Sequence, residues 1–104
     1  MTSITPKTYG DGDGASFLNI VGAATTVVKA YPGKLVRIVN NKKVANGVIT
    51  IYDNASAASG TKVGTITNPA TLLDNAQTYE YGCNLNNGLV IVTSAADDLT
   101  VVFK

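Results

Sequence analysis

Short segments rich in Val, Ile, Thr and Tyr recur along this chain, and clusters of Gly, Asn, Asp and Pro separate them about every eight to twelve residues. That spacing is typical of a β-sandwich or barrel, in which many short strands are joined by tight turns. Helix signals are nearly absent. The sequence therefore predicts an all-β fold, a β-sandwich of about seven to eight antiparallel strands that is either jelly-roll or immunoglobulin-like. The expected strands cover residues 17–21, 25–30, 34–40, 48–53, 61–67, 77–81, 89–94 and 99–103.

The length of 104 residues fits one domain and leaves no room for a second core. We assign residues 17–104 to a single β-sandwich domain. The preceding stretch, Met1–Ser16, contains repeated Gly and Asp residues, which favour turns, and we predict that it forms an extended N-terminal arm. One further segment, Pro69–Asn75, is expected to form a short helix or an irregular crossing between strands.

Three of the expected strands are apolar on both faces over much of their length, namely residues 35–39, 89–92 and 99–103. A strand with one face in water alternates apolar and polar residues, so the second face of these strands needs a cover. The N-terminal arm, a loop or another subunit could each supply that cover, and the sequence leaves the three alternatives open.

The surface of this protein is expected to be unusually neutral. Charged residues make up 14% of the chain, against roughly 25% in ordinary soluble domains. Asn, Thr, Ser and Gly take their place, as suits a surface that neighbouring molecules cover. The net charge is +1, and the eight basic residues are scattered rather than gathered into the stripe that neutralises phosphates. We therefore expect no nucleic-acid partner.

Few residues in the chain could perform catalysis. There is no His, which removes the commonest general base and the commonest metal ligand. Of the six Asp and one Glu, the pair Asp97–Asp98 and the single Asp53 are interpreted as turn residues. Glu80 is expected to face outward between inward-facing Tyr79 and Tyr81. We therefore expect no enzymatic activity and assign no catalytic residues.

The sequence also predicts no metal site and no cofactor. The run that begins at Asp11 resembles the start of a calcium-binding loop, but positions five, six and twelve of that loop would be Ala15, Ser16 and Gly22. Cys83 is the only cysteine, so no disulfide can form within the chain, and we expect it to be a small buried apolar residue near a strand end.

A glycan-binding surface is an alternative, because tyrosine rings can stack on sugar rings. The tyrosines on or beside the expected strands are more simply explained by core or cross-strand packing. They are Tyr31, Tyr52, Tyr79 and Tyr81.

No run of the sequence approaches the ~18 apolar residues that cross a bilayer, so we expect no membrane association. The first residues, Met1–Pro6, lack the basic and apolar regions of a signal peptide. We therefore expect the protein to be made and folded in a cytoplasm.

Four blocks of sequence, in this order, are similar to a known group of proteins. They are Val27–Ile38 (VVKAYPGKLVRI), Ile51–Thr61 (IYDNASAASGT), Asn87–Val92 (NGLVIV) and Asp98–Lys104 (DLTVVFK). The order and spacing of these blocks resemble small all-β proteins encoded among the structural genes of tailed bacteriophages, and the resemblance extends from Thr25 to the end. Members of that group are assigned to the virion, as capsid decoration (cement) proteins or as small tail components.

The resemblance implies a structural virion protein, most simply a capsid decoration protein that stabilises the major capsid lattice by packing. Its partners would be the major capsid protein or other virion proteins, with a homo-oligomer expected and a trimer as one option. The alternatives are a tail, baseplate or fibre component and, from another class, a glycan- or host-surface-binding module. Because no motif of the group fixes a binding site, the expected contact segments are our own hypothesis: Met1–Ser16, Asn40–Asn46 and Asn54–Gly60.

Overall fold

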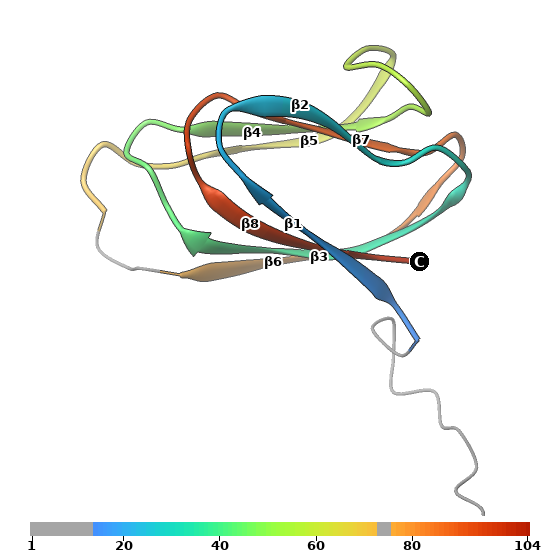
Figure 1. Ribbon diagram of the computed structural model, residues 1–104, viewed down its shortest axis with the longest axis horizontal. Coiled ribbons are helices and arrows are strands. Elements are labelled where there is room, and N and C mark those ends of the chain that lie inside the picture. The colour runs from blue at the N-terminus through green and yellow to red at the C-terminus, as the bar shows by residue number, and fades with distance from the viewer. Residues whose placement is uncertain (1–13, 73–75) are drawn as a thin grey trace, which may run out of the picture.

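The fold is a sandwich of two four-stranded antiparallel sheets (Figure 1). A computed structural model describes residues 14–72 and 76–104. Within them lie eight strands and no helix, which confirms the predicted all-β sandwich. The strands are β1 (Ser16–Val21), β2 (Ala24–Lys29), β3 (Gly33–Lys42), β4 (Val48–Asp53), β5 (Thr61–Thr67), β6 (Gln77–Leu85), β7 (Leu89–Thr93) and β8 (Asp98–Phe103).

The strand order identifies the sandwich as a jelly roll. Sheet A has the order β1-β8-β3-β6, and sheet B has the order β2-β7-β4-β5. The pairs β1·β8, β2·β7, β3·β6 and β4·β5 are therefore nested one inside the next, as in an eight-stranded ribbon folded over on itself. An immunoglobulin-like sandwich would place its first two strands in one sheet, whereas β1 and β2 lie in different sheets. Of the two predicted architectures, the jelly roll is the one observed.

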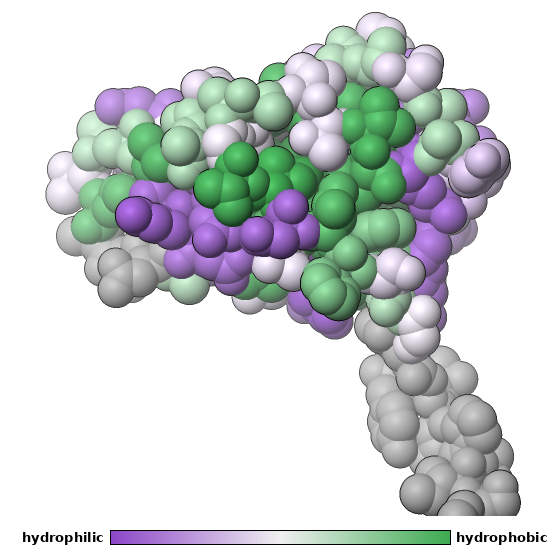
Figure 2. Space-filling view, viewed as in Figure 1, coloured by the Kyte–Doolittle hydropathy of each residue, from purple (hydrophilic) through white to green (hydrophobic). Residues whose placement is uncertain are grey.

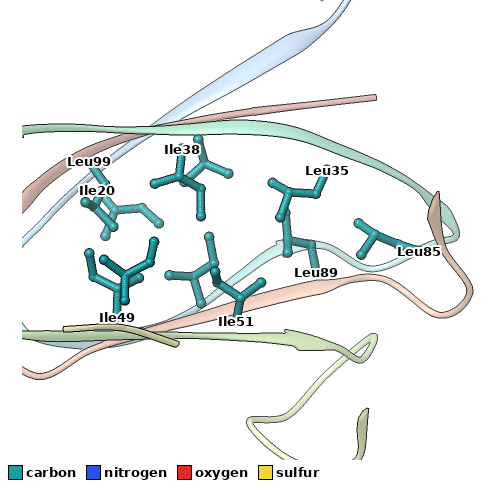
Figure 3. Packing of buried hydrophobic residues seen from close by; sticks show 11 residues of the cluster. Ile20, Leu35, Ile38, Ile49, Ile51, Leu85, Leu89 and Leu99 are labelled. Atoms are coloured by element: carbon teal, nitrogen blue, oxygen red, sulfur yellow. The ribbon is translucent and has the colours of Figure 1, made fainter. Parts of the chain in front are cut away.

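The hydrophobic core fills the space between the sheets, with side chains from both sheets pointing toward one another (Figure 3). Its members alternate along their strands with outward-facing residues, because successive side chains of a strand point to opposite faces. Tyr79 and Tyr81 pack against this core as predicted, and a Cβ atom at Gly64 would lie 3.0 Å from the Tyr81 hydroxyl. The buried cluster comprises Ile20, Leu35, Ile38, Ile49, Ile51, Ile66, Leu85, Leu89, Ile91, Leu99 and Val101.

The strands that are apolar on both faces cover part of their second face within the chain. Val90 is fully buried on the outer face of sheet B, where its cross-strand neighbours are Val27 and Tyr52. Val36 is fully buried at a register shift in β3. Val92 and Val102 stay half-buried on the outer faces, so the cover is incomplete.

Several boundaries differ from the prediction. β3 continues to Lys42 and β6 continues to Leu85, so both strands are longer than expected. Residues 69–72 are irregular and not helical, and residues 73–75 lie outside the described residues. Of the predicted arm, residues 1–13 also lie outside them, and β1 begins at Ser16.

Candidate interaction surfaces

The outer face of sheet B is almost uncharged, because Thr, Val and Tyr side chains make up most of it. Inward-facing Ile49, Ile51 and Ile91 fix the alternation, so the residues between them point away from the core. The register of β2, β7, β4 and β5 then places these outward residues in rows across the sheet. The rows are Val27–Val90–Tyr52–Lys62 and Thr25–Val92–Thr50–Thr65. In these rows Lys62, on the edge strand β5, is the only charged residue.

The outer face of sheet A carries more charge, although it also includes the exposed Phe17 and Val21 of the edge strand β1. Arg37 and Glu80 are paired across β3 and β6, and the Arg37 Nε lies 2.7 Å from the Glu80 Oε1. Asp98 at the start of β8 accepts a hydrogen bond of 2.7 Å from the Asn19 Nδ2. An exposed pair such as Arg37–Glu80 contributes little to stability, about 0–1 kcal/mol. The two outer faces of the sandwich therefore differ in charge.

A third surface lies where the sandwich is open, along the edge strands β1 and β2 (Figure 1). Phe17 and Val21 on β1 are 73% and 64% exposed, and Val27 on β2 is 45% exposed. Figure 2 shows hydrophobic residues gathered across the middle of this side of the molecule. None of the predicted contact segments includes these residues. The sequence feature that could have indicated this apolar surface is the lack of any charged residue in residues 16–21.

The predicted turn pair lies where the sequence placed it, with Asp97 in the connection between β7 and β8 and Asp98 at the start of β8, but Asp97 is buried. One carboxylate oxygen, Oδ2, accepts hydrogen bonds from the Asn40 Nδ2 (2.8 Å) and the Asn68 Nδ2 (2.6 Å). Asn68 also donates to the carbonyl of Val44 (2.9 Å). A buried carboxylate is tolerated only with such partners, so these residues tie the ends of β3, β5 and β8 together. The side-chain oxygens Asn40 Oδ1, Asn68 Oδ1 and Asp97 Oδ1 are buried without a hydrogen-bond partner among the described atoms.

Asp53, also interpreted as a turn residue, does not bind the loop that directly follows it. Its carboxylate instead binds the turn between β6 and β7. Its carboxylate accepts backbone hydrogen bonds from Asn86 (2.9 Å), Asn87 (2.8 Å) and Gly88 (3.3 Å) in the turn between β6 and β7. Burial by itself raises the pKa of Asp53, but the three hydrogen bonds outweigh it, and the pKa lies below its ordinary value. Gly88 is required there, because a Cβ atom would collide with the backbone of Lys29, Asn54 and Ala55.

Burial also shifts the pKa of two further side chains in the sandwich, Cys83 and Tyr81. Cys83 is half-buried in β6, two residues before the strand ends at Leu85, and burial raises the pKa of its thiol. Burial likewise raises the pKa of the Tyr81 hydroxyl. Among the described residues, no group of three or more His, Cys, Asp or Glu side chains is placed to hold a metal ion. In the same part of the chain, no helix is long and apolar enough to cross a membrane.

The predicted contact segments and tyrosines have mixed outcomes. Within Asn40–Asn46, Asn40 is fully buried and belongs to β3, so it is not available to a partner. Within Asn54–Gly60, residues 56–60 form an exposed loop that projects from the sandwich (Figure 1).

The packing predicted for Tyr31 is wrong, because its side chain is 71% exposed beyond the end of β2. Tyr52 packs across strands as predicted, opposite Val90 and Lys62.

A scan against models of protein families, a search of curated proteins and a search of solved structures each find no match to this chain.

Proposed function

We propose that this protein is a structural virion protein of a tailed bacteriophage, a capsid decoration (cement) protein that binds the major capsid lattice by surface packing. The observation that carries the proposal is the neutral outer face of sheet B. A broad face of Val, Thr and Tyr offers apolar contact area and hydroxyl groups without charges that must be desolvated. The jelly-roll architecture is consistent with it, since viral capsid domains often use this fold. The similarity of the four sequence blocks points in the same direction.

In this function the protein would bind many equivalent sites on a particle, each contact being weak. Copies held on a lattice gain avidity, because one bound contact raises the effective concentration of the next. Tyr52 is the expected centre of the contact, since interface energy concentrates in aromatic residues flanked by packed neighbours such as Val90. Because few charges take part, we expect binding to depend only weakly on ionic strength.

The test is co-sedimentation of the purified protein with phage capsids that lack it, at low and high salt. We expect the protein to bind at both salt concentrations. We also expect capsids to be disrupted at a higher temperature when the protein is bound. Thr50→Lys places a charge in the middle of the sheet B face and should reduce binding at least tenfold. Thr78→Lys, on the polar face of sheet A, is the matched control and should bind like the wild type. Equal binding by the two variants would exclude the sheet B face as the contact.

A tail, baseplate or fibre component is the alternative within the same class, and antibody labelling of intact virions would place the protein on the head or the tail. A glycan- or host-surface-binding module is the alternative from another class. The exposed ring of Tyr31 favours it, because an aromatic face in solvent can stack on a sugar, and lectin domains also use jelly rolls. Binding on a glycan array that Tyr31→Ala abolishes would support that function instead.

A further inference from the structure

β1 is an edge strand without the usual protection against pairing. It lies at the end of sheet A, and only β8 is its neighbour among the described strands. Its sequence, SFLNIV, contains no charge and no Pro, and its pairing with β8 runs from Ser16 to Val21 without a register shift. Edge strands expose unpaired backbone donors and acceptors, and proteins normally blunt them with Lys, Pro or bulges.

The other three edges carry such devices. β2 has a register shift between Val27 and Lys29 and ends on a lysine. β5 contains Lys62, and its pairing with β4 is shifted beside Ile51. β6 contains Glu80, and its pairing with β3 is also shifted. Among the strands of the described residues, β1 is therefore the edge that a further strand could extend most readily.

We propose that β1 pairs with β1 of a second copy of this chain, antiparallel and about a two-fold axis at Asn19, so that the two A sheets form one continuous sheet. A two-fold axis perpendicular to the sheet keeps each side chain on its own face, so the paired residues must share a face. Phe17, Asn19 and Val21 face outward, since Leu18 and Ile20 face the core. The register centred on Asn19 sets Phe17 of each copy opposite Val21 of the other.

The order of side chains along β1 favours a second copy over any other partner. The strand reads apolar, apolar, polar, apolar, apolar from Phe17 to Val21, which is symmetric about Asn19. Self-pairing therefore covers both strongly exposed apolar residues of the strand at once. At this two-fold axis Asn19 meets its own copy, so a charged residue at that position would be repelled, and β1 carries no charge. The Asn19 amide is already bound to Asp98 and to the Leu99 carbonyl, which turns it toward β8.

This association is independent of the proposed virion function, because it concerns only copies of the chain, whatever particle they bind. The paired strands are short compared with a standard interface of ~800 Å² per partner, so we expect a weak dimer.

Disulfide trapping tests the register directly. In a Cys83→Ser background, Phe17→Cys and Val21→Cys proteins are oxidised with diamide, separately and as a mixture. Residues directly opposite have Cα atoms about 4.5–5.5 Å apart, within the range that a disulfide spans. In the proposed register each cysteine lies four residues from its own copy, roughly 13 Å away. We expect cross-linked dimer in the mixture and not in either protein alone. The proposal is overturned if either single protein cross-links as fast as the mixture. It is also overturned if Phe17→Cys cross-links no faster with Val21→Cys than with Tyr31→Cys, whose cysteine lies outside β1.

Light scattering over a concentration series is the second measurement. The wild-type mass should rise from the chain mass of 10.7 kDa toward twice that value as the concentration approaches about 1 mM. The double variant Phe17→Lys, Val21→Lys sets like charges opposite one another and should stay monomeric, with an unchanged circular dichroism spectrum because both side chains are exposed. Mixing it with Phe17→Glu, Val21→Glu should restore the dimer mass. A wild-type mass that stays monomeric, or that reaches a trimer, contradicts the pairing.

Discussion

Replacing Asp97 by alanine removes the acceptor on which the buried cluster of Asn40, Asn68 and Asp97 depends. Both amide groups donate to the same carboxylate oxygen, over 2.8 Å and 2.6 Å, and all three residues are at least 98% buried. Without Asp97, the Asn40 amide loses its side-chain acceptor and the Asn68 amide keeps only the Val44 carbonyl. The Asp97→Ala protein should therefore be much less stable than expected for a residue next to a turn.

The size of the loss follows from the partners that Asp97 has. A hydrogen bond to a charged group contributes about 1.5–3 kcal/mol, and a buried donor left unpaired costs about 1–3 kcal/mol. Asp97 accepts two such hydrogen bonds, so we expect a decrease of about 4 kcal/mol in the free energy of unfolding. For a domain of this size, that corresponds to a melting temperature lower by roughly 15–30 °C. Asp97→Asn, which keeps an acceptor oxygen but not the charge, should lose less than half as much.

Urea unfolding followed by circular dichroism, with calorimetry for the melting temperature, measures the effect. Asp98→Ala is the matched control one residue away. Asp98 accepts hydrogen bonds from Asn19 (2.7 Å) and Asn41 (3.3 Å) at the surface, and their loss should cost no more than about 1 kcal/mol. If Asp97→Ala and Asp98→Ala were destabilised equally, the buried cluster would not contribute as the hydrogen bonds suggest.

Three further predictions concern other contacts. Burial raises the pKa of Asp53, but its backbone hydrogen bonds outweigh that effect and keep the pKa below the ordinary 3.8. The Asp53 carboxylate therefore stabilises the fold above pH 3.8, and this stabilisation is lost as the pH falls through the lowered pKa. Urea titrations should therefore show Asp53→Asn less stable than the wild type at pH 7, and a smaller difference at pH 3. Gly47→Ala would place a Cβ atom 2.7 Å from the Asp97 Oδ1, and thermal unfolding should show a loss of about 1–3 kcal/mol, absent for the exposed neighbour variant Ala45→Ser. Burial raises the pKa of the Cys83 thiol, so a chromogenic disulfide reagent should react at least tenfold more slowly with the folded than with the urea-unfolded protein at pH 8; equal rates would contradict the burial.

The positions of the strands could be predicted where strong turn residues flank them. β4 and β5 have the predicted bounds, since Asn46–Gly47, Asn54–Gly60 and Asn68–Pro69 interrupt the chain on either side of them. In the first of these turns the residue with positive φ is Asn46, at 64°, and the Gly47 amide donates to the Val44 carbonyl (3.0 Å). Local chemistry is sufficient for such boundaries because a turn depends on its own four residues.

The end of β6 could not be predicted from local chemistry. The sequence predicts a strand that ends at Tyr81, but the next residue, Gly82, has a φ of 59° inside β6, close to the register shift with β3. A glycine within a strand pattern marks either a stop or a bulge, and the partner strand decides which.

The buried cluster was missed for a related reason. Asp97 lies 57 residues from Asn40 and 29 residues from Asn68 along the chain, so no local pattern joins them. A turn aspartate and a buried aspartate look alike in sequence, because burial depends on which distant segments cover the residue. The exposed apolar edge at Phe17 and Val21 was missed because the edge position of β1 follows from the strand order alone.

The nested strand order also determines how the chain reaches its fold. β4 and β5 close a short loop, whereas β1 must find β8 across a separation of 79 residues at the contact of Asn19 with Asp98. The entropy of loop closure favours pairing from the inside outward, so β1 acquires its partner last, and folding of such non-local topologies takes milliseconds to seconds. During that interval an uncharged strand without Pro is free on both edges and can pair with other unfolded chains. The yield of refolding should therefore fall as the chain concentration rises, even where the folded protein is stable.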